Sequence, residues 1–124
     1  MAIMIDSDTV LKLVVCREWR NPERIASHFP PSGEMPLVAL LHLMDVSSRD
    51  RLWVLHRLIL EPGRFSILPE ALVDQLVDTQ GLENVYGYAE RLWLRTTTDT
   101  DRDVLAFRIL EPLRECIEAW EESQ

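Results

Sequence analysis

Three aspartates at alternate positions, Asp99, Asp101 and Asp103, are the residues of this chain best spaced to begin a metal-binding loop. Acids at positions 1, 3 and 5 begin a calcium loop, which also needs a glycine at position 6 and a glutamate at position 12. Here position 6 is Val104 and position 12 is Leu110. Both requirements fail, so we expect the aspartates to begin a helix or to occupy a hairpin turn. We expect neither a metal nor another cofactor.

The three histidines are the next candidates for chemistry. His28, His42 and His56 are spaced fourteen residues apart, and none forms the HxH or HxxxH pair that a metal site on one element would use. His42 lies within the apolar stretch LLHLM, which predicts a core histidine with a hydrogen-bonded ring. A three-histidine site assembled from separate helices remains the alternative.

The motifs of nucleophilic catalysis are missing from the sequence. It contains no GxSxG, and its four glycines lie too far apart to form a phosphate-binding loop. Lys12 is the only lysine, and the two cysteines, Cys16 and Cys116, are 100 residues apart without metal-type spacing. We therefore expect reduced thiols and a protein that is not an enzyme.

Charge is divided unevenly along the chain. Residues 1–64 carry eight acids and eight bases, whereas residues 65–124 carry thirteen acids and five bases. The whole formal net charge of -8 therefore belongs to the second half. A surface of this sign repels phosphate backbones and attracts basic proteins, so nucleic acid is an unlikely partner. The alternative is that the acids serve only solubility.

Length and hydrophobic pattern suit one domain spanning residues 1–124. The chain has 124 residues, of which 47% are hydrophobic, and these are sufficient for a single core. Apolar runs are interrupted by charges before they reach the roughly 20 residues of a membrane span. The N-terminal MAIMIDSDTV has no secretory pattern. We expect a cytoplasmic protein without a membrane segment.

The elements that would position these residues are mostly helical. Cap residues and apolar spacing of three and four predict a mainly α fold, a single compact helical domain with room for a small β-hairpin. Ser47 and Asp50 have the spacing of a capping box, which predicts a helix start. The expected helices are 6–19, 21–29, 36–46, 47–60, 69–81, 82–90 and 112–123, and the expected strands are 64–68, 92–98 and 103–109.

The order of elements in residues 47–110 is similar to a winged helix-turn-helix domain. The segment TTTDTDRDVLAFRI looks like the wing of MarR-type repressors, in which two strands flank an acidic turn. The resemblance implies that LENVYGYAERL is the recognition helix and that the chain is a DNA-binding transcription regulator. That segment carries Glu83 and Glu90 but only one arginine, Arg91, which favours a protein partner over DNA.

The letters Ile-Leu-Glu-Pro occur twice, at 59–62 and at 109–112. Around them, residues 54–64 match residues 104–114 at seven of eleven positions, and the match ends on both sides. It is too short for a structural repeat. Pro62 is expected to end one helix. Pro112 is expected to be the first residue of another, with Leu113, Ile117 and Trp120 on its apolar face.

The sequence therefore favours a non-enzymatic, acidic protein-binding module of adaptor, immunity or inhibitor type that acts on a basic partner. Trp120 is either an anchor of that contact or a residue that closes the core. Leu113, Ile117 and Trp120 are also suited to pairing across the axis of a homodimer. The expected contact residues are Asp99, Asp101, Asp103, Glu115, Glu118, Trp120, Glu121 and Glu122.

Overall fold

The computed structural model describes residues 2–13, 19–80 and 98–124, which form a mostly helical protein with one small antiparallel sheet. The predicted helix 82–90 and nearly all of the predicted strand 92–98 lie outside the described residues, as does Cys16. The mainly α prediction is confirmed. The elements are β1 (Met4–Asp6), α1 (Ser7–Leu13), α2 (Pro22–Ala26), β2 (Glu34–Pro36), α3 (Leu37–Leu41), α4 (Ser48–Leu60), α5 (Pro62–Phe65), α6 (Glu70–Gln80) and α8 (Asp99–Ser123).

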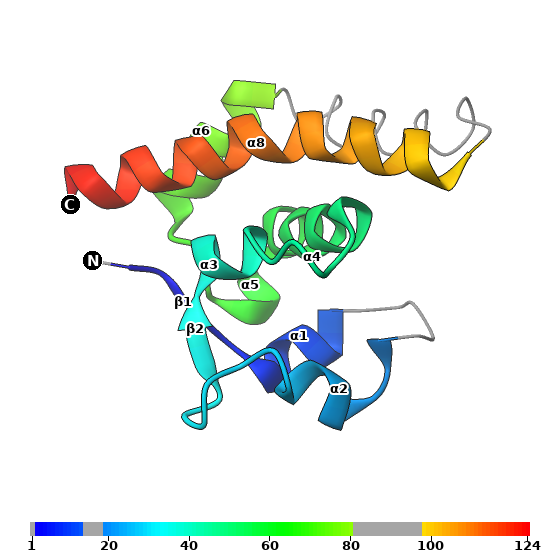
Figure 1. Cartoon of the computed structure of the whole chain (residues 1–124). Coiled ribbons are helices and arrows are strands. Elements are labelled where there is room, and N and C mark those ends of the chain that lie inside the picture. Colours follow the sequence, from blue (N-terminus) through cyan, green and yellow to red (C-terminus); the bar gives the residue numbers. More distant parts are fainter. Residues whose placement is uncertain (1, 14–18, 81–97) are drawn as a thin grey trace.

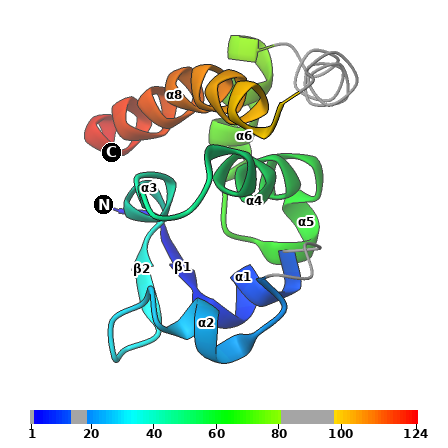
Figure 2. The same ribbon diagram turned by 45° about the vertical axis from the view of Figure 1, so that its right-hand side comes forward.

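Helix α4 lies at the centre of the molecule. Helices α6 and α8 pack on one side of it and α1 packs on the other, with α2 beyond (Figures 1 and 2). Its start follows the predicted capping pattern, because the backbone N–H of Asp50 donates to Ser47 Oγ at 3.2 Å. A helix between two layers must be apolar around most of its circumference. The buried residues of α4 accordingly include Leu52, Val54, Leu55, Leu58 and Ile59.

Helix α8 runs without interruption from Asp99 to Ser123. The predicted strand 103–109 and the predicted helix start at Pro112 are therefore wrong, whereas the expectation that the aspartates begin a helix is confirmed. The physical reason is a stripe at helical spacing that continues through Pro112 and packs on α4, α6 and α3. The buried residues of this stripe are Ala106, Leu110, Leu113 and Ile117.

Pro112 is tolerated inside α8 because it faces solvent. A proline in a helix removes the hydrogen bond to the carbonyl four residues earlier, here that of Arg108, and its ring crowds the same carbonyl. Arg108 is also exposed, so water can bond its carbonyl. The polar outer face of α8 thus accommodates a residue that its buried face could not.

The sheet joins two segments far apart in sequence. Strands β1 and β2 pair antiparallel with Ile5 opposite Met35. The residue immediately before β2 is Gly33, whose φ is 77°. The strand predicted at 64–68 is wrong. Residues 62–65 form α5 instead, because Pro62 suits the first position of a helix. With strands 64–68 and 103–109 both replaced by helix or loop, the winged-helix order is not present in the described residues.

The remaining N-terminal predictions are confirmed in part. Asn21 caps α2 by accepting from the backbone N–H of Glu23 at 3.0 Å. The expected helix 6–19 is observed as α1 up to Leu13, where this described range ends, and Asp6 belongs to β1 instead. The expected helix 36–46 is observed as α3, which ends at Leu41. Among the described residues, no helix is long and apolar enough to cross a membrane.

Candidate functional site

The first acids of α8 contribute to the fold. Asp103 accepts a hydrogen bond from the backbone N–H of Arg49 at 3.2 Å and so satisfies a donor at the start of α4. A carboxylate there also complements the positive end of the helix dipole. The side chains of Asp99 and Asp101 lie outside the description. Of the three predicted aspartates, the one that can be examined has a structural contact.

Glu118 belongs to a charged cluster on the surface of α8. Arg114 donates from Nη1 to Glu118 at 2.8 Å and from Nε to Glu111 at 3.1 Å, and His42 Nε2 lies 3.6 Å from Glu118. The hydrogen bond from Arg114 lowers the pKa of Glu111, and the same bond raises the pKa of Arg114. A single positive charge is therefore shared between Glu111 and Glu118 and offsets part of their negative charge.

Glu121 also has an internal contact, since its Oε1 accepts from the backbone N–H of Ile3 at 2.9 Å and ties β1 to the end of α8. Trp120 is half-buried and packs against the core. This position agrees with one of its two predicted roles, that of a residue that closes the core. Leu113 and Ile117 are fully buried within the chain, so neither side chain is available to pair across a dimer axis.

Glu115 and Glu122 differ from these acids. Both are exposed, and neither forms an ion pair with a residue that the structure describes. They lie seven positions apart on the solvent face of α8, which corresponds to two helical turns and about 10 Å along the axis. Of the predicted contact residues that can be examined, these two remain fully available to a partner.

The same face of α8 carries two exposed apolar residues that the sequence prediction missed. Val104 is 47% exposed and Phe107 is 40% exposed. They continue the line of Glu115 and Glu122 at spacings of three and four, which places all of them on one side of the helix. We call this line the outer row of α8. Its members are Val104, Phe107, Glu111, Glu115, Glu118 and Glu122.

Helix α6 presents a second acidic line. Glu70, Asp74 and Asp78 are all exposed and spaced by four, opposite the buried Leu72 and Leu76. The helix packs against α8. The sequence signal for this line was the four-residue spacing of its acids.

The three histidines occupy different surroundings. His28 Nδ1 lies 3.2 Å from Asp45, and His42 contacts Glu118 with half of its side chain exposed, so the prediction of a core histidine at 42 is wrong. His56 is the buried one, and burial lowers its pKa, which keeps the ring neutral. Within residues 2–13, 19–80 and 98–124, no group of histidines, cysteines and acids could hold a metal ion.

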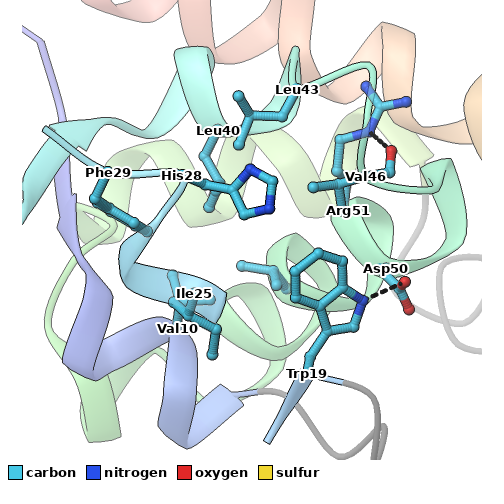
Figure 3. Close-up of a pocket in the computed structure, with 11 residues that line it drawn as sticks. Val10, Trp19, Ile25, His28, Phe29, Leu40, Leu43, Val46, Asp50 and Arg51 are labelled. Atoms are coloured by element: carbon cyan, nitrogen blue, oxygen red, sulfur yellow. Dashed lines mark hydrogen bonds between the residues drawn. The ribbon is translucent and has the colours of Figure 1, made fainter. Parts of the chain in front are cut away.

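A pocket that the sequence did not predict lies between α1 and α2 on one side and α3 and α4 on the other (Figure 3). Its volume is about 40 Å³, and it is partly open to solvent. The walls come from segments distant in sequence, which is why no local motif indicated it. They are formed by Val10, Trp19, Ile25, His28, Phe29, Leu40, Leu43, Val46, Asp50, Arg51 and Val54.

The charged residues at the pocket bond to the protein itself. Arg51 is only 4% exposed, and it donates to the carbonyls of Leu41 at 2.7 Å and Val46 at 3.1 Å and to Ser48 Oγ at 2.8 Å. Asp50 accepts from Trp19 Nε1 at 2.8 Å (Figure 3). Burial lowers the pKa of Arg51. Arg51 nevertheless holds the loop between α3 and α4 through these three bonds.

Comparisons of the chain with protein-family models, with curated proteins and with solved structures found no match in any of the three.

Proposed function

We propose that this chain is a non-enzymatic, acidic protein-binding module of the cytoplasm, of adaptor, immunity or inhibitor type, and that the outer row of α8 contacts a basic partner. The observation that carries the proposal is the position of Glu115 and Glu122, which are exposed and unpaired among the described residues. They stand on a helix whose opposite face is fixed in the core by Leu110, Leu113 and Ile117.

The rigid helix gives the contact its geometry. Charges about 10 Å apart on one face suit arginines or lysines at the same spacing on a partner helix, or about three positions apart in an extended segment. Val104 and Phe107 add an apolar patch at the other end of the row. Complementary charge steers encounter and fixes register, while apolar contact supplies affinity.

The other predicted contact acids that the structure describes bond to the protein itself, which leaves fewer residues free for a partner. Asp103 and Glu121 are engaged with backbone donors, and Glu118 shares Arg114 with Glu111. Removing any of these acids would perturb the fold as well as binding. Glu115 and Glu122 are therefore the positions at which binding can be tested without a structural cost.

The test uses a matched pair of double variants. Wild-type protein, Glu115→Gln with Glu122→Gln, and Glu70→Gln with Asp74→Asn are immobilised and exposed to a lysate of the native host. Captured proteins are identified by mass spectrometry and then titrated individually. Both variants remove two exposed negative charges, but only the first alters the outer row.

We expect the α8 variant to weaken the captured complex on the order of tenfold, as the loss of two exposed charge pairs implies, and the α6 variant to leave it nearly unchanged. The captured protein should present a basic surface, and added salt should weaken the complex. Equal losses in both variants would contradict the proposal. Binding to duplex DNA that falls steeply with salt would also contradict it and would favour a nucleic-acid partner.

A further inference from the structure

The pocket between α2 and the α3–α4 loop offers a ligand almost no free polar group. Arg51 donates from each of its three side-chain nitrogens to protein oxygens, and Asp50 accepts from both Trp19 and Ser47. His28 is paired with Asp45 at the rim. A charged or strongly polar ligand would lose its hydration without gaining partners, so the pocket disfavours it.

Water is also a poor occupant. A buried water needs two to four polar partners, and cavities walled by apolar side chains stay dry and accept apolar molecules instead. Side chains such as Ile25, Phe29, Leu40 and Val54 supply the pocket's walls. The cavity therefore favours an apolar ligand over solvent.

The volume sets the size of the group that can enter. One water needs about 10–15 Å³ on this scale, so about 40 Å³ holds roughly three or four non-hydrogen atoms. That is the size of an isobutyl or isopropyl group. Because the pocket is partly open, the remainder of a larger molecule can stay in solvent.

The loop between α3 and α4 lines the pocket and contains a side chain suited to adjusting around such a ligand. Leu43 and Val46 line the pocket, and Met44 between them is 78% exposed. Methionine is flexible and polarizable, and it packs against apolar groups of different shape. The exposed side chain of Met44, next in sequence to Leu43, is free to contact the part of a ligand that protrudes.

We propose that this pocket binds the branched aliphatic end of a small uncharged molecule, with Trp19 and Phe29 among the residues enclosing that end and the exposed Met44 next in sequence to the lining residue Leu43. Helices α1 and α2, which supply part of the pocket's wall, lie on the opposite side of α4 from α8 (Figure 1). The lining residues include none from α8, so the site is separate from the proposed protein contact. Its test does not depend on that contact.

The experiment follows the indole N–H signal of Trp19 by NMR in ¹⁵N-labelled full-length protein. Trp19→Phe assigns that signal, whose donor bonds to Asp50 at the pocket. Isobutanol is the probe, and glycerol is a polar probe of similar size. Val46→Phe fills the pocket from its rim, and Val77→Phe places the same ring at a half-buried valine of α6 that does not line the pocket.

We expect isobutanol to shift the Trp19 signal saturably with millimolar affinity and glycerol to leave it unchanged. Val46→Phe should weaken the binding at least tenfold, and Val77→Phe should not. If Val46→Phe does not fold, Val10→Leu fills the same pocket from α1. A linear, non-saturating shift, or equal binding in the filled variant, would overturn the proposal.

Discussion

Replacing Arg51 with methionine tests most directly how the α3–α4 loop is held. Methionine keeps much of the apolar stem of arginine but none of its donors. The change leaves the carbonyls of Leu41 and Val46 without the bonds of 2.7 Å and 3.1 Å that the guanidinium supplies. It also removes the bond to Ser48 and the positive charge that faces Asp103 and Glu111.

The size of the effect follows from two opposing contributions. Each buried acceptor left unsatisfied costs about 1–3 kcal/mol, and two carbonyls are affected. Burying the guanidinium is itself unfavourable, and its removal returns part of that cost. We therefore expect Arg51→Met to lower the free energy of unfolding by about 2–4 kcal/mol. Arg51→Lys should show a smaller loss, because one ammonium cannot reach three acceptors in the fork geometry of arginine.

Urea unfolding followed by circular dichroism measures the change. The midpoint should fall with little change in slope, since the variant alters stability and not the surface exposed on unfolding. Arg64→Met is the matched control, because Arg64 is exposed. Among the described residues its ion pair is with Glu61, three positions earlier. Its loss should lower the free energy of unfolding by less than about 1 kcal/mol. If Arg51→Met unfolds within about 0.5 kcal/mol of wild type, the loop is held by packing and our reasoning is wrong.

Three further changes test other contacts. Burial lowers the pKa of His56 below 6.5 in the fold, so the unfolded chain takes up the proton first as the pH falls. The free energy of unfolding therefore decreases as the pH drops below about 6.5. In urea titrations at several pH values, His56→Gln should reduce this decrease by about 1 kcal/mol per pH unit. Asp103→Ala should lower the free energy of unfolding by about 1 kcal/mol, because the backbone N–H of Arg49 loses its acceptor. Glu115→Ala should change it by less than about 0.5 kcal/mol. Equal urea midpoints for the two variants would refute the capping role of Asp103. Pro112→Ala should stabilise α8 by up to about 3 kcal/mol and raise the melting temperature, and a lower melting temperature would show that the helix depends on its proline.

The features predicted correctly from the sequence are those that depend on residues close together in the chain. The cap at Ser47, the cap at Asn21 and the helix of residues 69–81 all depend on neighbours within a few positions, and each is observed, the last as α6. The two Ile-Leu-Glu-Pro segments show where such local prediction ends. Pro62 begins a short helix after α4, whereas Pro112 lies within one. The buried stripe of α8 decides the second case, and only tertiary packing reveals which face is buried.

For the candidate sites too, local features could be predicted from the sequence and contacts between distant residues could not. The acidity of the second half was visible in composition, but which acids bond to the protein was not. Asp103 meets Arg49 across fifty-four positions and Glu121 meets Ile3 across one hundred and eighteen, so no local pattern contains these contacts. The burial of His56 and the exposure of His42 also depend on which helix faces cover them. The pocket escaped prediction because its walls combine residues from several elements between positions 10 and 54, and no local pattern contains them all.

The late position of α8 in the chain has a consequence for synthesis on the ribosome. Leu110, Leu113 and Ile117 cover α4 and α6, so both helices emerge before the residues that bury their apolar faces. The last contact, between Ile3 and Glu121, joins almost the two ends of the described chain. Contacts so distant in sequence close slowly. The nascent chain must therefore carry an uncovered apolar surface until α8 has been synthesised, and this interval is when it is most exposed to aggregation and to chaperones.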